Sequence, residues 1–265
     1  MLSGMLLIVA ALAEELATGL NLCSHRQKRR HAGIPVWTGI HRGRTLRFVK
    51  LGMGPDRSAA TLERALGALE ATVILSFGYA GALDPGLKVG ELVVGERADL
   101  LSPASRGDSL DSLGLGGSWP LAAPDALLGL AQASGLPAHR GGVLTSPCVM
   151  GAPEHKRILF ARFHDRIVDM ETAALARVAA AASIPLQCVR AVSDSADDDS
   201  LSFLSYDPDA GPVQKAARGL AAGSWLKRYS HWREGSAAAR RSLGRFLACY
   251  LDADEVIPSS PGERT

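Results

Sequence analysis

The sequence predicts an α/β protein, a single domain of three layers, α/β/α, around a central mixed sheet that is mostly parallel. Two observations favour this class. Short, continuously apolar runs, typical of strands buried on both faces, alternate with longer stretches that suit helices. The 265 residues are 47% hydrophobic and 21% charged, which is enough apolar material for one sizeable core.

The expected strands are apolar runs, in chain order residues 6–12, 36–40, 45–51, 72–77, 91–94, 142–145, 167–170 and 186–192. The second and third are expected to pair through the turn at residues 41–44. The expected helices are residues 58–69, 126–133 and 171–182. Asp56 is the expected N-cap of the first helix.

We expect the domain to span residues 1–252. Residues 100–124 are rich in Ser, Gly, Asp and Pro and predict a long loop or insertion. From about residue 208 a helical C-terminal extension is expected, with two or three helices carrying Trp225, Tyr229 and Trp232. Packing against the sheet is the favoured role of these aromatic side chains, and covering a substrate is the alternative. Residues 253–265 predict a disordered tail.

Charge, cysteines and the N-terminus restrict the partners and the compartment. A net charge of +2 requires neither nucleic acid nor an anionic membrane as a partner. Four scattered cysteines without a CxxC pair indicate reduced thiols in a cytoplasmic protein, with no metal site. The apolar run at residues 5–12 lacks a preceding basic region and is far shorter than about 18 residues, so a buried strand is favoured over a signal peptide or membrane span.

Several polar segments directly follow expected strands. Glu15, the glycine-rich residues 78–81, Glu171 and Asp194 each come after an apolar run. Ligands of α/β sheets bind beyond the carboxyl ends of the strands, so we expect these four segments to converge on one rim.

Three segments carry a family resemblance. Residues 76–94 contain Ser-Phe-Gly-Tyr-Ala-Gly-Ala-Leu-Asp-Pro followed by Leu-Lys-Val-Gly-Glu, residues 168–176 read Val-Asp-Met-Glu-Thr-Ala-Ala-Leu-Ala, and residues 185–197 contain Arg-Ala-Val-Ser-Asp-Ser-Ala-Asp. A weaker match covers residues 10–16. In order and spacing they resemble the nucleoside phosphorylase superfamily (purine/uridine phosphorylase type), in particular its 5′-methylthioadenosine/S-adenosylhomocysteine nucleosidases. The resemblance implies that family's fold, cleavage of the N-glycosidic bond of an adenine-type purine nucleoside, no organic cofactor and a homo-oligomer.

Asp194 is the candidate general acid. Cleavage of the bond places negative charge on the departing base, and a carboxylic acid beside N7 relieves it if its pKa is raised towards working pH. The resemblance implies this role for Asp194, with Ser193 at the substrate. An aspartate at a strand end is by itself more often a cap or loop residue. The neighbouring Arg190 and Asp197 favour the catalytic role.

Two glutamates complete the predicted catalytic set. Glu171 is expected to accept hydrogen bonds from the ribose hydroxyls, with Met170 against the ribose face. The alternative is a first-turn glutamate favoured by the helix dipole. The resemblance implies that Glu15 polarises the attacking water, and the alignment of the first strand favours it over Glu14.

Phosphate is the alternative nucleophile. Phosphorylases of the family carry one Arg three residues before the Ser or Thr of the glycine-rich turn and another in an N-terminal loop. This chain has Ser76 and Glu15 in those regions. A phosphate dianion therefore lacks an evident bidentate partner, which favours water over inorganic phosphate. Arg57 stays open as another anion contact.

Departures from the family pattern leave the substrate open. Tyr79 stands where a small residue is usual and is expected to reach the ligand beside Gly78. The base-contact region at Val149 and Met150 matches poorly. Residues 76–85, with the Arg-rich C-terminal extension, resemble the hopanoid-associated phosphorylases, which are linked to removing adenine from an adenosylated hopanoid lipid.

Two alternatives are weighed against a soluble nucleosidase. The lipid-linked alternative would allow the weakly amphipathic residues 225–247 to contact a membrane, although packed surface helices are favoured. The other is a non-catalytic nucleoside-binding protein on the same fold. It is disfavoured because a binder need not keep both Asp194 and Glu171.

Overall fold

A computed structural model describes residues 5–102, 109–204 and 225–253, and all its strands belong to one ten-stranded sheet. The strands are β1 (Leu6–Ala10), β2 (Ser24–His31), β3 (Ile34–His41), β4 (Arg44–Lys50), β5 (Val73–Ala82), β6 (Leu92–Leu101), β7 (Leu115–Pro120), β8 (Ala138–Thr145), β9 (Ile167–Asp169) and β10 (Leu186–Asp194). The helices are α1 (Ala13–Leu20), α2 (Pro55–Leu66), α3 (Pro124–Ala133), α4 (Pro153–Phe163), α5 (Thr172–Ala181) and α7 (Trp225–Asp252), with short 3₁₀ turns at Leu110–Ser112 and Ser202–Leu204.

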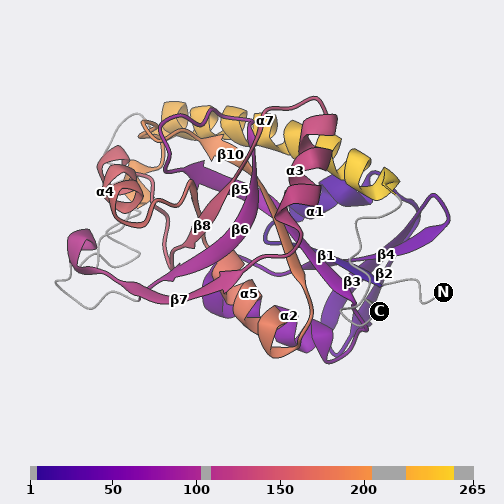
Figure 1. Cartoon of the computed structure of the whole chain (residues 1–265). Coiled ribbons are helices and arrows are strands. Elements are labelled where there is room, and N and C mark those ends of the chain that lie inside the picture. The colour runs from indigo at the N-terminus through magenta and orange to yellow at the C-terminus, as the bar shows by residue number, and fades with distance from the viewer. Residues whose placement is uncertain (1–4, 103–108, 205–224, 254–265) are drawn as a thin grey trace.

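Part of the sheet closes on itself. Strand β5 pairs with β10, β10 with β6, β6 with β8, β8 with β9, and β9 again with β5, so these five strands form a ring. The remaining strands extend from β5 in the order β1, β4, β3, β2, and β7 pairs with β6 (Figure 1). The ring brings the carboxyl ends of β5 and β10 side by side, because they run parallel from Leu186–Ile74 to Asp194–Gly81.

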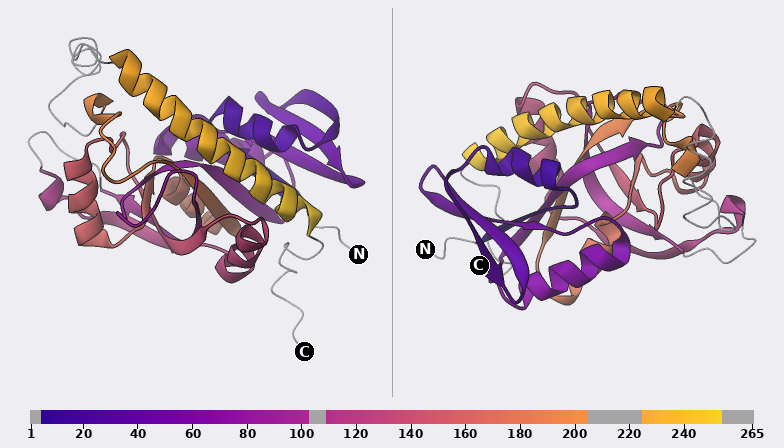
Figure 2. Two further views of the ribbon diagram at one scale, coloured as in Figure 1. Left: turned by 90° about the horizontal axis from the view of Figure 1, so that it is seen from above. Right: turned by 180° about the vertical axis from the view of Figure 1, so that it is seen from behind.

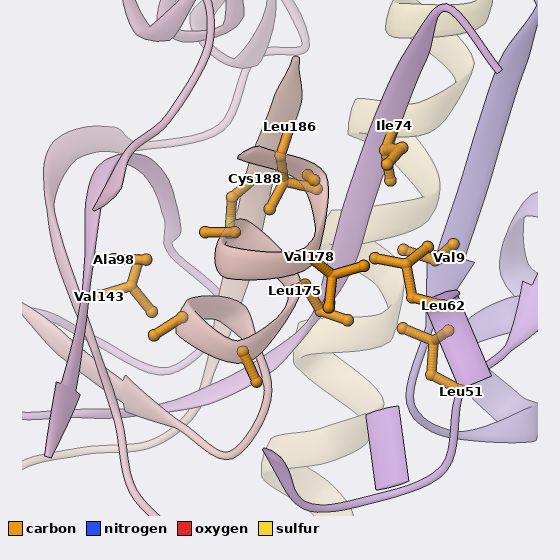
Figure 3. Packing of buried hydrophobic residues seen from close by; sticks show 14 of the residues in the cluster. Val9, Leu51, Leu62, Ile74, Ala98, Val143, Leu175, Val178, Leu186 and Cys188 are labelled. Atoms are coloured by element: carbon orange, nitrogen blue, oxygen red, sulfur yellow. The ribbon is translucent and has the colours of Figure 1, made fainter. Parts of the chain in front are cut away.

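Helices cover both faces of the sheet, which confirms the predicted α/β class with a central mixed sheet. Helices α2 and α5 pack on one face, where Leu62, Leu175 and Val178 meet Val9 and Ile74 (Figures 1 and 3). Helices α1, α3 and α7 cover the other face through a second apolar cluster. Burial on both faces explains why β1 and β10 are buried at every position.

The structure corrects three expectations about the sheet and helices. The sheet is not mostly parallel: the ladders β2–β3, β3–β4, β5–β9, β6–β7 and β6–β10 are antiparallel. Asp56 is not a cap, because α2 begins at Pro55 after Gly54, whose φ of 93° suits glycine. The predicted loop at residues 100–124 contains strand β7, whose Gly-rich sequence hides it from a propensity argument.

The C-terminal extension is described only in part. Its described residues form one 28-residue helix, α7, as the helical prediction for this region expected. The beginning of the extension and nearly all of the predicted tail lie outside the described residues. In the described part of the chain, no helix combines the length and apolar character needed to cross a membrane.

Candidate active site

A cavity lies at the carboxyl ends of β1, β5, β9 and β10, and the four predicted polar segments converge around it. Its lining includes the residues predicted from the sequence, Glu15, Tyr79, Val149, Met150, Met170, Glu171, Ser193 and Asp194. Gly81, Met53, Leu201 and Trp232 also contribute. Gly78 lines a smaller neighbouring cavity together with Ser76, Glu15, Glu171 and Arg190.

Asp194 ends β10 and is buried. Its Oδ1 accepts a hydrogen bond from Ser193 Oγ at 2.7 Å. Its Oδ2 accepts one from Lys156 Nζ at 2.6 Å, and Lys156 also donates to the Ser195 carbonyl at 2.6 Å. A Cβ atom on Gly81 would lie 2.8 Å from Asp194 Oδ2, so any larger residue here would displace this carboxylate.

Lys156 is the group at the site that the sequence did not reveal. It lies on α4, a helix that was not predicted, and it is fully buried. Burying an ammonium is costly unless it is paired and hydrogen-bonded, and here it is paired with Asp194. A lone lysine in a polar stretch carries no sequence signal for such a position.

Glu15 lies in the first turn of α1 and is buried, whereas Glu14 is exposed. Its two oxygens accept hydrogen bonds from the backbone amides of Leu12 at 2.7 Å and Tyr79 at 2.8 Å. Burial raises the pKa of Glu15 to about 7, against the lowering effect of these amides. Gly78 allows the close approach, since a Cβ there would meet Glu15 Oε1 at 2.7 Å.

Glu171 is the N-cap residue of α5 and faces the same cavity. Its Oε1 accepts a hydrogen bond from the Gly54 amide at 2.9 Å, which ties the start of α2 to the site. Burial, with the nearby Asp169 carboxylate second, raises the pKa of Glu171 to about 7. Two carboxyl groups with pKa values near neutrality thus share one cavity with Asp194, which suits proton transfer at neutral pH.

Arg190 lies behind the two glutamates and is fully engaged. Its Nε donates to Asp169 Oδ2 at 3.0 Å, and its Nη2 donates to Ser76 Oγ at 3.0 Å and Thr172 Oγ1 at 2.6 Å. Arg57, the other cation considered for an anion site, is exposed and is absent from the cavity lining. Neither guanidinium is placed as a free fork for a phosphate dianion.

Two aromatic side chains mark the edge of the site. Tyr79 lines the cavity, but it also packs against the apolar cluster under α7, and its buried hydroxyl has no hydrogen-bond partner among the described residues. Its contact with a ligand stays a prediction. Trp232 of α7 lines the cavity, so the alternative role of covering a substrate fits its position. The side chains of Trp225 and Tyr229 lie outside the described set.

Comparison with known proteins agrees with this geometry. The family model of the phosphorylase superfamily matches residues 3–222. The chain therefore belongs to the phosphorylase superfamily, as the three motifs predicted. A 5′-methylthioadenosine/S-adenosylhomocysteine nucleosidase from Haemophilus influenzae is 27% identical over 224 residues, covering 79% of this chain and 94% of the relative.

Solved structures share the fold at lower identity. A 5′-methylthioadenosine-bound mutant of a Helicobacter pylori nucleosidase (MTAN) has a TM-score of 0.72 at 18% identity, covering 95% of this chain and 99% of that one. The futalosine hydrolase of Helicobacter pylori has a TM-score of 0.71 at 18% identity, covering 94% and 97%. The Neisseria meningitidis nucleosidase in complex with methylthio-immucillin-A has a TM-score of 0.70 at 18% identity, covering 93% and 97%.

Proposed function

We propose that the protein hydrolyses the N-glycosidic bond of an adenine-type purine nucleoside. The observation that carries the proposal is the convergence of three buried carboxyl groups, those of Glu15, Glu171 and Asp194, on one cavity whose described lining has no free guanidinium. The relatives named above include nucleosidases and a hydrolase, which supports water as the nucleophile. No organic cofactor is part of the proposal.

Asp194 acts on the base. In its protonated form, the Asp194 carboxyl group donates its proton to N7 as the bond breaks, so that the base leaves as a neutral molecule. The carboxylate that remains is stabilised by the Lys156 ammonium and the Ser193 hydroxyl, whose hydrogen bonds are already formed. Lys156 is therefore a positioning residue, acting through Asp194 on the substrate.

Glu15 and Glu171 act on the other side of the bond. Glu15, held by two backbone amides, accepts a proton from the attacking water. Glu171 accepts hydrogen bonds from the ribose hydroxyls, and its negative charge favours the cationic sugar of the transition state. The small cavity between Glu15, Ser76 and Arg190 offers polar partners on several sides, which is what a bound water requires.

The alternatives predict different features. Phosphorolysis needs a bidentate cation for the dianion, and the Arg190 guanidinium is committed to Asp169, Ser76 and Thr172. A binding protein would not require the buried acid–lysine pair beside the base. The proposal also includes a homo-oligomer, which is supported by the family likeness alone. It also includes a cytoplasmic location, where the four free cysteines would stay reduced.

The test is base release from adenosine, inosine, 5′-methylthioadenosine and an adenosyl-lipid mimic, each with and without phosphate. Free sugar formed at the same rate without phosphate supports hydrolysis. Sugar 1-phosphate formed only with phosphate overturns it, and strong preference for the adenosyl-lipid mimic moves the substrate to the lipid-linked class. Tight binding without turnover of any substrate would favour the nucleoside-binding alternative.

A further inference from the structure

The charges of the chain are segregated. Residues 17–55 contain eight Lys or Arg, three His and no Asp or Glu. The whole chain has 29 Lys or Arg and 27 Asp or Glu, so the other residues hold 21 against 27. Residues 17–55 thus carry a formal charge of +8 and the rest of the chain carries −6, although the net charge is only +2. Such asymmetry is a signal for an anionic partner that the net charge hides.

The basic region folds into the antiparallel meander β2–β3–β4, and β2 is its free edge. Residues 24–30 of β2 are all exposed. Among the described residues, no carboxylate pairs with Arg26, Lys28, Arg29 or Arg30. Arg26 and Arg30 donate to neutral acceptors, Asn21 Oδ1 and the Gly33 carbonyl, so their charges stay uncompensated.

The cations of β2 project to both faces of the sheet. Successive residues of a strand point to opposite faces, which puts Lys28 and Arg30 on one face and Arg29 and His31 on the other. The Lys28 ammonium lies 4.9 Å from the centre of the Trp37 ring. A partner that lies along one face would meet only one of these rows, whereas a flat surface that meets the strand edge-on would meet both.

We propose that the β2 edge docks the protein on an anionic lipid bilayer. A bilayer is flat, and clusters of Lys and Arg bind anionic headgroups without a further motif. Among the described residues, the large exposed hydrophobic ones, Met53, Val89 and Leu115, all lie outside the meander, so the contact is peripheral and electrostatic. Single-stranded nucleic acid is less favoured, because it binds to exposed aromatic platforms and Trp37 is half-buried under Lys28.

The docking edge lies away from the cavity. Helix α7 begins near the cavity, where Trp232 lines it, and ends beside the meander, where Asp252 Oδ1 lies 2.7 Å from His41 Nε2 (Figure 2). Edge-on docking therefore leaves the cavity open to solution. The proposal does not depend on the nucleosidase activity.

The experiment is co-sedimentation of the whole protein with vesicles of phosphatidylcholine, with or without phosphatidylglycerol. We expect binding only to the mixed vesicles, with release at high salt, where screening shortens the reach of surface charge. Exchanging Arg26, Lys28, Arg29 and Arg30 for Gln should weaken binding by more than about 100-fold, at about fivefold per cation. The melting temperature reports the fold.

A matched control removes four exposed cations elsewhere, Lys88, Arg157, Arg177 and Arg241, also to Gln, with the same change in net charge. It should bind the mixed vesicles as the unchanged protein does. Equal loss in both variants would mean that only net charge matters and would overturn the proposal. So would an absence of vesicle binding, or binding of an oligonucleotide in place of vesicles.

Discussion

The strands β10 and β2 have similar lengths and opposite environments. All nine residues of β10 are buried, and the strand ends at Asp194 in the cavity. Seven of the eight residues of β2 are exposed, and the strand carries the uncompensated cations. A buried strand is constrained by packing on both faces, so its sequence reveals it, whereas an exposed edge strand needs only to be polar. Substitutions test this difference, and their effects should be largest at the cavity and smallest in the meander.

Asp194→Asn should have the largest effect. The amide cannot give up a proton to N7, so kcat should fall by at least about 100-fold, the scale of a lost general acid. Turnover of 5′-methylthioadenosine measures this, with circular dichroism as the check on folding. Turnover near that of the unchanged protein would remove Asp194 from the mechanism.

Gly81→Ala should come next. The added Cβ would lie 2.8 Å from Asp194 Oδ2, so the carboxylate must shift, and a displacement of this size near the reacting atoms costs roughly 10- to 100-fold in kcat. Gly129→Ala is the matched control, because nothing lies within 4 Å of its added Cβ on α3. It should leave turnover intact and raise stability by about 0.5–1 kcal/mol. Equal turnover in both variants would contradict the packing argument.

Glu15→Gln should change the pH dependence of stability as well as impair hydrolysis. The folded protein holds a proton on Glu15 up to a pKa of about 7, whereas the unfolded chain releases it near 4.5. The folded state therefore binds more protons between these values, and this glutamate lowers the free energy of unfolding as pH rises from 4.5 to 7. Replacing Glu15 with Gln should remove this pH-dependent fall in the free energy of unfolding, which amounts to up to about 3 kcal/mol. Melting curves of both proteins between pH 5 and 8 test this, and parallel curves would refute it.

Two glutamines give the smallest and most direct comparison of the two strands. Gln187 in β10 is fully buried and its Oε1 accepts a hydrogen bond from Tyr250 Oη at 2.6 Å. Replacing it with Ala leaves the buried hydroxyl without this acceptor and should cost about 1–3 kcal/mol. Gln27 in β2 is exposed, and its replacement with Ala should change stability by less than about 0.5 kcal/mol. Urea titrations measure the stability of both variants, and equal losses would contradict the difference between the two strands.

The apolar strands were predictable from the sequence, and so was the grouping of polar residues at their carboxyl ends. β1, β5 and β10 stand out as buried runs, and the polar residues after them converge as the rule for α/β sheets requires. β2 was not predictable, because Ser-His-Arg-Gln-Lys-Arg-Arg-His has no apolar alternation. The closed ring also escaped prediction, since its antiparallel ladders depend on contacts distant in sequence.

Within the site, motif residues were predictable and their supporting contacts were not. Glu15, Glu171 and Asp194 follow strands in recognisable segments. Lys156 has no motif, and its pairing with Asp194 arises only when α4 packs against the end of β10. The net charge of the chain likewise did not reveal the basic β2 edge, because it sums over regions of opposite charge that the fold separates.

The position of Trp232 on α7 has a consequence for how the protein is made. Most elements around the cavity precede residue 202, but one part of its wall comes from α7, near the end of the chain. A Cβ on Gly235 would lie 2.1 Å from the Ser193 carbonyl, so α7 also presses directly on the segment that holds Asp194. The chain is synthesised from its N-terminus, and a domain generally folds as a unit. A nascent chain therefore holds the acid and both glutamates before it has a complete cavity, which requires α7 as well.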